Sequence, residues 1–218
     1  MTDAERRFTA VRVEIRAGAK DQMTIGGYAA KFNRMSQNLG GFVESIADQF
    51  FNGSRGDGWP GVVARYNHDD MSLLGTSDAG TLRMTLDTVG LIYDVDLPQA
   101  RSDVFELVGR GDVRQSSFAF ICLEDDWGTT DQGFPMRTLR AGRLIDVAPV
   151  NTPAYVDTSV GLRSLAAKVE APLAEVERRA AAGDLISFLN RTDRPSPPRR
   201  SPHLALGKVL KLNADERL

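Results

Sequence analysis

The stretch Arg114–Phe120 reads RQSSFAF and places two adjacent serines at the start of an aromatic strand. Side chains of an extended strand alternate between its two faces. Ser116 therefore shares a face with the phenylalanines, whereas Ser117 lies on the opposite face with the small residue Ala119. The aromatic face is predicted to be core. On the other face small side chains leave room for another group, so Ser117 is either an incidental polar residue at a strand edge or a nucleophile.

Around this stretch, short apolar segments with a period of about two residues predict further strands. They cover residues 7–15, 23–32, 62–68, 81–86 and 91–97, with one or two strands over 136–150. Residues 42–51 predict a short strand that runs into a helical turn. Asp87–Gly90 is expected to join two of them as a hairpin. Ser102 is predicted to N-cap a short helix over residues 103–109, which ends at Gly109 or Gly111. Closely spaced strands with one mid-chain helix favour an α+β fold, with a mostly antiparallel barrel or sandwich.

The composition changes after Ser164. The following segment, LAAKVEAPLAEVERRAAAGDLISFLN, is rich in Ala, Leu and Glu, and the prolines of Pro195–Pro202 then predict an extended linker. We therefore expect a main domain over residues 1–164 and a helical and proline-rich C-terminal tail over residues 165–218. Such a tail is expected to be accessible to proteolysis.

The composition, 42% hydrophobic and 26% charged among 218 residues, is typical of a soluble globular protein. A net charge of −2 gives no basic field for nucleic acid. The longest apolar runs are far shorter than the roughly 20 residues that span a bilayer, and the charged N-terminus lacks the apolar region of a secretory signal. The single cysteine indicates a reducing compartment. We therefore expect neither nucleic acid nor membrane as a partner, and no secretion.

Two histidines and one cysteine are too few for an ordinary zinc site, so no metal is predicted. His203 lies in the proline-rich segment. His68 ends the predicted strand VVARYNH and is the histidine that a fold can hold in place. Cys122 shares the aromatic face of the serine strand, so it is predicted to be a small buried hydrophobe rather than a nucleophile.

Asp146 stands among apolar residues in LIDVAPV, where alternation puts it on one face with Leu144 and Ala148. A carboxylate in such a strand needs a partner if it is buried. The partner is either a set of backbone amides, one of the arginines Arg140 and Arg143, or an imidazole.

A serine, a histidine and a carboxylate are the parts of a hydrolytic triad, in which the carboxylate fixes the imidazole and the imidazole takes the serine proton. Ser117, His68 and Asp146 can supply them, with Asp69 and Asp70 as alternative carboxylates. The sequence has neither the G-x-S-x-G elbow nor the S-x-x-K pattern of common serine hydrolases.

Between Gly26 and Leu162 the chain resembles the tailed-phage (caudovirus) prohead maturation serine proteases, which share the herpesvirus assemblin-like fold. The blocks that carry the resemblance are GYAAKFN, GFVESI, YNHDDMSLLGT, LRMTLDTVGLIYDVDLP, VGRGDVRQSSFAF and LIDVAPVNTPAY. The resemblance implies a mostly antiparallel β-barrel of about six to seven strands with a few helices.

Carried over residue by residue, the resemblance implies that His68, Ser117 and Asp146 are catalytic. The position before Phe118 agrees with the face alternation in choosing Ser117 over Ser116. Ala119 replaces the usual glycine of the serine block, and Ala148 replaces the usual serine of the Val-Ser-Pro block; neither departure removes a triad member. Apart from the resemblance, backbone amides are the default donors for the oxyanion, and Arg140 or Arg143 can add positive charge.

The family further implies a serine endopeptidase of capsid maturation that cleaves scaffold protein, or the scaffold-like segment of the major capsid protein, and itself. Self-cleavage is then expected to remove part of the tail over residues 165–218. It is expected to act inside the procapsid in the host cytoplasm, without a cofactor, as a homo-oligomer such as a dimer. Two alternatives belong to other classes. One is a catalytically inert assembly or scaffolding module with the same fold, and the other is a small-molecule-binding barrel with an apolar interior cavity.

Overall fold

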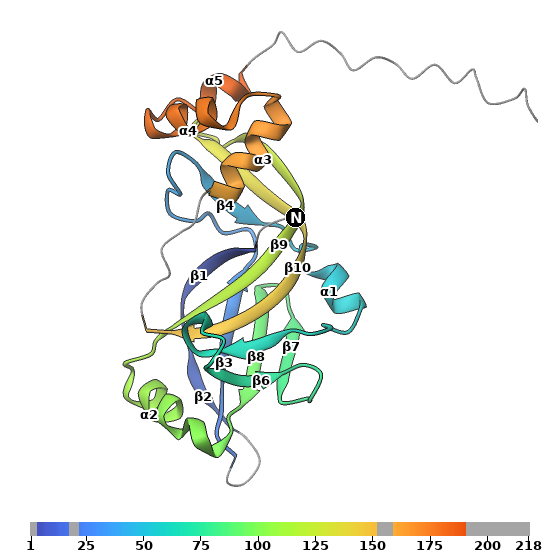
Figure 1. Ribbon diagram of the computed structural model, residues 1–218, viewed down its shortest axis with the longest axis vertical. Helices are drawn as coiled ribbons and strands as arrows, with labels where there is room; N and C mark the ends of the chain where they lie inside the picture. Colours follow the sequence, from blue (N-terminus) through green and yellow to red (C-terminus); the bar gives the residue numbers. More distant parts are fainter. Residues whose placement is uncertain (1–3, 18–21, 152–158, 191–218) are drawn as a thin grey trace, which may run out of the picture.

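The computed structural model describes residues 4–17, 22–151 and 159–190 (Figure 1). The strands are β1 (Glu5–Arg12), β2 (Glu14–Arg16), β3 (Thr24–Lys31), β4 (Val43–Ile46), β5 (Val63–Arg65), β6 (Leu73–Thr76), β7 (Leu82–Leu86), β8 (Gly90–Asp96), β9 (Gln115–Thr129) and β10 (Pro135–Val150). The α-helices are α1 (Asn52–Gly56), α2 (Ser102–Arg110), α3 (Ser159–Val169), α4 (Leu173–Ala181) and α5 (Ile186–Leu189), and the 3₁₀ turns are η1 (Tyr66–His68) and η2 (Gln99–Arg101).

The strands form two sheets. Sheet A has the order β1-β9-β10-β5-β6, with β4 also paired to β10, and sheet B has the order β2-β3-β8-β7. The pairings of β10 with β4 and with β5 are parallel, and the others are antiparallel. The expected α+β fold with mostly strands and few helices is therefore confirmed.

The expected closed barrel is not formed by the described strands. Sheet A ends at β1 and β6, and sheet B ends at β2 and β7, so both sheets stay open. The chain passes from one sheet to the other at Val13, which is fully buried between β1 and β2. Sequence alternation predicts strands and their buried faces, but it does not say which edges join.

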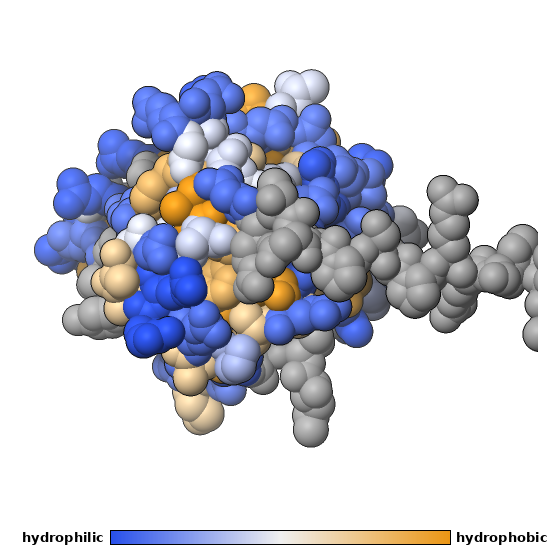
Figure 2. All heavy atoms as spheres, turned by 90° about the horizontal axis from the view of Figure 1, so that it is seen from above, coloured by the Kyte–Doolittle hydropathy of each residue, from blue (hydrophilic) through white to orange (hydrophobic). Residues whose placement is uncertain are grey.

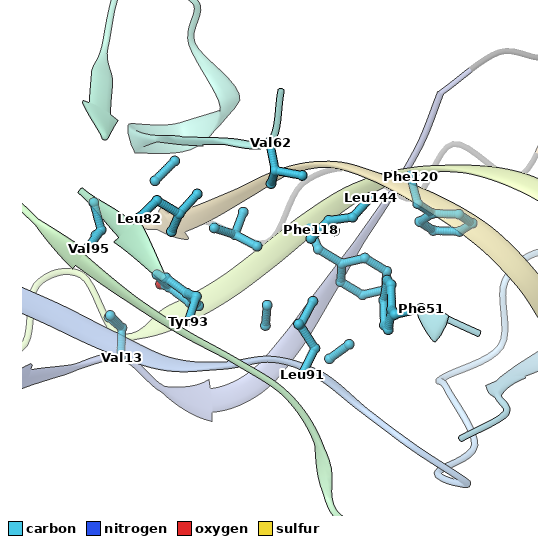
Figure 3. Packing of buried hydrophobic residues seen from close by; sticks show 14 of the residues in the cluster. Val13, Phe51, Val62, Leu82, Leu91, Tyr93, Val95, Phe118, Phe120 and Leu144 are labelled. Atoms are coloured by element: carbon cyan, nitrogen blue, oxygen red, sulfur yellow. The ribbon is translucent and has the colours of Figure 1, made fainter. Parts of the chain in front are cut away.

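Side chains of both sheets fill the space between them (Figure 3). Phe118 and Phe120 of β9 stack with ring centroids 5.3 Å apart, and Phe51 meets Phe118 edge to face at 5.8 Å. Tyr93 and Leu91 of β8 are buried in the same cluster. The predicted aromatic core face of β9 is thus confirmed, and packed side chains stand where a small-molecule-binding barrel would need an apolar cavity.

The faces of β10 differ from the prediction at one point. The register with β9 shifts between Leu144 and Asp146, so this bulge adds one residue to β10. Leu144 consequently packs in the core with Phe120, whereas Asp146 and Ala148 lie on the other face, opposite Ala119 and Ser117. The predicted shared face of Leu144 and Asp146 is wrong because strict alternation does not hold across a bulge.

Two local predictions also need correction, and one strand was missed. The strand predicted over residues 62–68 ends at Arg65 and is followed by η1, and the short strand β6 was not predicted. Helix α2 has Arg101 at its N-cap, without a side-chain cap, so Ser102 is its first residue instead of the cap. Its end agrees with the prediction, because Gly111 takes the left-handed conformation (φ 83°) that favours glycine. The hairpin at Asp87–Gly90 is also formed, between β7 and β8.

Helices α3, α4 and α5 gather at the end of the molecule opposite α2 (Figure 1). They bury a second apolar cluster against the loop around Phe42, whose ring lies 4.9 Å from that of Trp127 in β9. Seen from above, hydrophilic side chains surround smaller hydrophobic patches at this end (Figure 2). Helix α3 runs through Ser164, whose hydroxyl donates to Asp125 of β9. Residues 165–190 are therefore folded onto the sheet.

The division into residues 1–164 and 165–218 stays a prediction. The proline-rich segment Pro195–Pro202, His203 and the charged C-terminal end lie outside the described residues. Within the described ranges, no helix is both long and apolar enough to cross a bilayer.

Candidate active site

The two serines of β9 face different surroundings, as the alternation predicts. Both are fully buried. Ser116 points into the core and its hydroxyl lies 3.1 Å from the Tyr93 hydroxyl, a phenol whose pKa is raised by burial. Ser117 lies on the opposite face, beside the backbone of β10 at Ala148. Ser116 thus makes a hydrogen bond in the core, whereas Ser117 belongs to a separate polar site.

His68 reaches that site from η1, the tight turn at the end of β5. Asn67 and His68 have positive φ angles of 54° and 57°, a conformation uncommon for residues other than glycine. The turn is held from both sides. The Asp69 amide donates to the Tyr66 carbonyl, and the Asn67 side-chain oxygen accepts from the Asn151 amide at the end of β10, at 3.1 Å. Backbone in such conformations persists where the surrounding structure imposes it, and it is frequent at functional sites.

The three predicted side chains come together. His68 Nε2 lies 2.6 Å from Ser117 Oγ, and His68 Nδ1 lies 2.6 Å from Asp146 Oδ1. A carboxylate only accepts hydrogen bonds, so the neutral imidazole carries its proton on Nδ1 and leaves Nε2 free to accept from the serine hydroxyl. The side chains of His68 and Asp146 are each 2% exposed. Bulk water therefore does not compete for either hydrogen bond.

Asp146 has a second partner that the sequence reasoning missed. Arg65, the last residue of β5, donates from Nη1 to Asp146 Oδ2 at 3.1 Å, and its Nη2 lies 3.2 Å from Asp70. The expected arginine partners are elsewhere: Arg140 pairs with Asp126 at 2.9 Å, and Arg143 is exposed. The pairing follows from topology, because β5 lies parallel to β10 with Val63 opposite Asp146. A signal was present in the sequence, since Arg65 stands three residues before His68.

The alternative carboxylates are used in other ways. Asp69 accepts from the Ser72 hydroxyl at 2.8 Å and from the Met71 amide at 3.0 Å, and these hydrogen bonds lower its pKa. Asp70 is 83% exposed and pairs with Arg65. Of the three candidate carboxylates, Asp146 is the one that accepts from the histidine.

Neither arginine expected at the oxyanion lies near Ser117. Arg143 pairs across the ladder with Ile121, four residues from Ser117 along β9. At about 3.3 Å per residue this separation is roughly 13 Å, beyond the reach of an arginine side chain. Arg140 lies farther along β10 and is bound to Asp126. The expected contribution of either charge to the oxyanion is therefore wrong.

Cys122 takes no part in the site. It packs against the core cluster, and its thiol contacts the Glu124 carbonyl at 3.5 Å. Burial raises the pKa of the thiol to about 12, so the reactive thiolate is scarce at neutral pH. Across the part of the chain that the structure describes, no group of three His, Cys, Asp or Glu side chains is placed to hold a metal ion.

A hydroxyl, an imidazole and a carboxylate joined in series are the side-chain set of a serine-type hydrolase. A family model described as caudovirus prohead serine protease matches residues 10–171, and the chain belongs to this family. The resemblance noted in the sequence is thereby confirmed, over a longer span than its blocks covered. The matched range contains His68, Ser117 and Asp146. No curated protein and no solved structure matches the chain.

Membership of this family identifies the chain as a protease of phage capsid maturation, which acts in the procapsid. The match begins at Ala10, inside β1, so Glu5–Thr9 precede it. This part of β1 nevertheless pairs with β9, the strand that carries Ser117.

Proposed function

We propose that this chain is a serine endopeptidase with Ser117 as nucleophile, His68 as general base and acid, and Asp146 as the carboxylate that orients the imidazole. The observation that carries the proposal is the pair of 2.6 Å hydrogen bonds that link Ser117 to His68 and His68 to Asp146. Both lie in surroundings that exclude water, where hydrogen bonds of this kind are strengthened.

In the proposed reaction, Ser117 Oγ attacks the carbonyl carbon of the scissile peptide bond while its proton passes to His68 Nε2. The imidazolium that forms is stabilised at Nδ1 by Asp146. His68 then gives the proton to the nitrogen of the leaving amine, which breaks the C–N bond and leaves an acyl group on Ser117. Water, deprotonated by His68, cleaves this ester and restores the serine.

Arg65 is a positioning residue in this scheme. Its hydrogen bond to Asp146 Oδ2 leaves Oδ1 directed at the histidine. The scheme therefore assigns one oxygen of Asp146 to Arg65 and the other to His68.

The proposed substrates are the scaffold protein, or the scaffold-like segment of the major capsid protein, and the chain itself. The proposed setting is a homo-oligomer, such as a dimer, enclosed in the procapsid in the host cytoplasm. Family membership supports this assignment. An inert assembly module is supported less well, because it gives no reason to hold His68 at a positive φ angle against a buried serine.

The test is co-expression of the chain with the capsid and scaffold proteins of its phage, followed by mass spectrometry of the fragments in isolated procapsids. Ser117→Ala and His68→Ala are expected to stop cleavage, and Ser116→Ala is the matched control that keeps most of it. Cleavage that persists in Ser117→Ala procapsids would remove this serine as the nucleophile. Intact procapsid proteins with the unaltered chain would favour the inert module.

A further inference from the structure

The outer edge of the nucleophile strand is occupied by the chain's own N-terminal strand. β1 pairs antiparallel with β9, and Phe8 stands opposite Ser117 while Arg7 stands opposite Phe118. Adding an extended peptide to a sheet edge is a common way to bind a peptide, with main-chain hydrogen bonds giving the affinity. β1 therefore lies where an extended substrate would pair with β9.

The peptide bond between Arg7 and Phe8 meets the proposed nucleophile. Ser117 Oγ lies 2.9 Å from the Arg7 carbonyl oxygen, and its single hydroxyl hydrogen can turn to this oxygen or to His68 Nε2. The carbonyl carbon is one C=O bond, about 1.2 Å, from that oxygen, so it lies at most about 4.1 Å from Oγ. Atoms that are about to react lie about 3–3.5 Å apart. A small shift of β1 therefore brings the Arg7 carbonyl carbon to that distance from Ser117 Oγ. His68 Nε2 is already on Oγ to take the proton.

Buried ion pairs hold β1 in this place. The Arg7 guanidinium donates to both oxygens of Glu44, at 2.7 and 2.9 Å, and to Glu5 at 2.7 Å. Glu5 in turn accepts two hydrogen bonds from Arg137 of β10, at 2.7 and 3.0 Å. The four side chains are between 0% and 7% exposed.

The electrostatics of this cluster favour its charged form. Burial opposes the charge on Arg7, but the carboxylates of Glu44 and Glu5 outweigh it and raise its pKa. Burial likewise opposes the charge on Arg137, and its hydrogen bonds to Glu5 with the charges of Glu5 and Glu44 raise its pKa. Both arginines stay charged, so the side chain of Arg7 remains anchored. Its backbone carbonyl is thereby fixed at Ser117, whereas the neighbouring Arg6 is exposed.

We propose that the Arg7–Phe8 bond is a processing site of this chain, cut by Ser117 of the same molecule. The proposal rests on the proposed function. Ser117 Oγ forms an ester with the Arg7 carbonyl carbon, its proton passes through His68 to the Phe8 nitrogen, and the C–N bond breaks. Water then cleaves the ester, which gives a carboxylate at Arg7, a free amine at Phe8 and the original serine.

Processing also opens the site to other peptides. The segment that ends at Arg7 loses its covalent tie to the rest of β1, and its departure exposes the β9 edge at Phe118 and Phe120. Glu44 then loses the guanidinium that engaged both of its oxygens. The vacated place fits an extended peptide that carries an arginine immediately before the bond to be cut.

The experiment follows the N-terminus of the purified full-length chain by intact mass and by sequencing of the new terminus. The unaltered chain is expected to lose the residues before Phe8, at a first-order rate that does not change over a tenfold range of protein concentration. Ser117→Ala is expected to stay intact. Arg7→Ala, which removes the anchor on Glu44, is expected to slow the cut at least tenfold. Arg6→Ala is the matched control, one residue away and exposed, and is expected to stay within twofold.

Arg7→Lys is a second variant that keeps the test valid if the Arg7→Ala chain does not fold. It keeps the charge but loses the two-pronged contact with Glu44, and its cutting rate is expected to fall between those of the unaltered chain and of Arg7→Ala. A rate that rises with concentration, or an Arg6→Ala chain slowed as much as the Arg7 variants, would overturn the proposal.

Capsid and scaffold substrates are assayed in parallel. If a chain that keeps its Arg7–Phe8 bond cleaves these substrates in a Ser117-dependent way, the processing site is refuted and the proposed function is supported. Absence of any Ser117-dependent cleavage would sink the proposed function and the processing site together.

Discussion

Replacing Asp146 with asparagine tests the roles of the two carboxylate oxygens, one of which binds His68 and the other Arg65. Asp146 accepts from His68 Nδ1 at 2.6 Å and from Arg65 Nη1 at 3.1 Å. An asparagine side chain offers one oxygen and one NH₂ group, so it satisfies one of these donors and opposes the other. The amide group of the asparagine therefore has two possible orientations, and the hydrogen bond to Arg65 favours one of them.

A hydrogen bond to a charged group contributes about 1.5–3 kcal/mol, against about 0.5–1.5 kcal/mol for a neutral pair. The asparagine oxygen is therefore expected to turn to the Arg65 guanidinium and its NH₂ to His68. Nδ1 must then accept, which moves the imidazole proton to Nε2, where it faces Ser117. In this tautomer the histidine does not accept the serine proton. The loss of the right tautomer in a well-studied serine protease lowers kcat about 10⁴-fold, and we expect a similar loss for Asp146→Asn.

The double variant Asp146→Asn/Arg65→Ala removes the guanidinium that competes for the amide oxygen. The preference for the wrong orientation falls by about 1–2 kcal/mol, so cleavage is expected to recover roughly tenfold relative to Asp146→Asn. The assay is the time course of capsid-protein fragments in co-expressed procapsids, with Arg65→Ala alone as the control. A double variant no faster than Asp146→Asn would refute the assignment of Arg65, and an Asp146→Asn rate within tenfold of the unaltered chain would refute that of Asp146.

Further predictions concern the core, the thiol and the ion pairs. Ser116→Ala loses the hydrogen bond to Tyr93, so urea unfolding is expected to show a loss of about 1 kcal/mol with cleavage retained, and a dead variant would contradict the strand register. Iodoacetamide is expected to leave Cys122 unmodified at pH 8 because its pKa is about 12; rapid alkylation of the folded chain would contradict its burial. Arg137→Met removes one of the two cations that Glu5 and Glu44 share, and is expected to cost about 3–5 kcal/mol in urea unfolding, whereas a loss below about 1 kcal/mol would show that the cluster is solvated.

Alternation along the strands predicted much of the site. It separated Ser116 from Ser117, and the apolar neighbours of Asp146 marked a carboxylate in need of a partner. These inferences hold because a side chain in a paired strand has two faces and its neighbours show which one is buried. The α+β class follows from the same pattern.

The remaining features depend on contacts between distant segments. The bulge before Asp146 and the positive φ angles at Asn67 and His68 break the regular period, so no count of residues predicts them. Arg65 meets Asp146 because β5 lies parallel to β10, a pairing between strands about 80 residues apart. The open edges of the two sheets likewise depend on which strands pair, and the position of β1 on β9 has no local signal at all.

Under the proposed mechanism, the burial of Ser117 delays cleavage in an infected cell until β1 moves. A nucleophile with no exposed surface is out of reach of the proteins around it, however abundant they are. Newly made copies can accumulate beside host proteins and unassembled capsid subunits without digesting them. Cleavage of other proteins then starts only after β1 has moved. A phage whose shell closes before that time confines proteolysis to the inside of the shell.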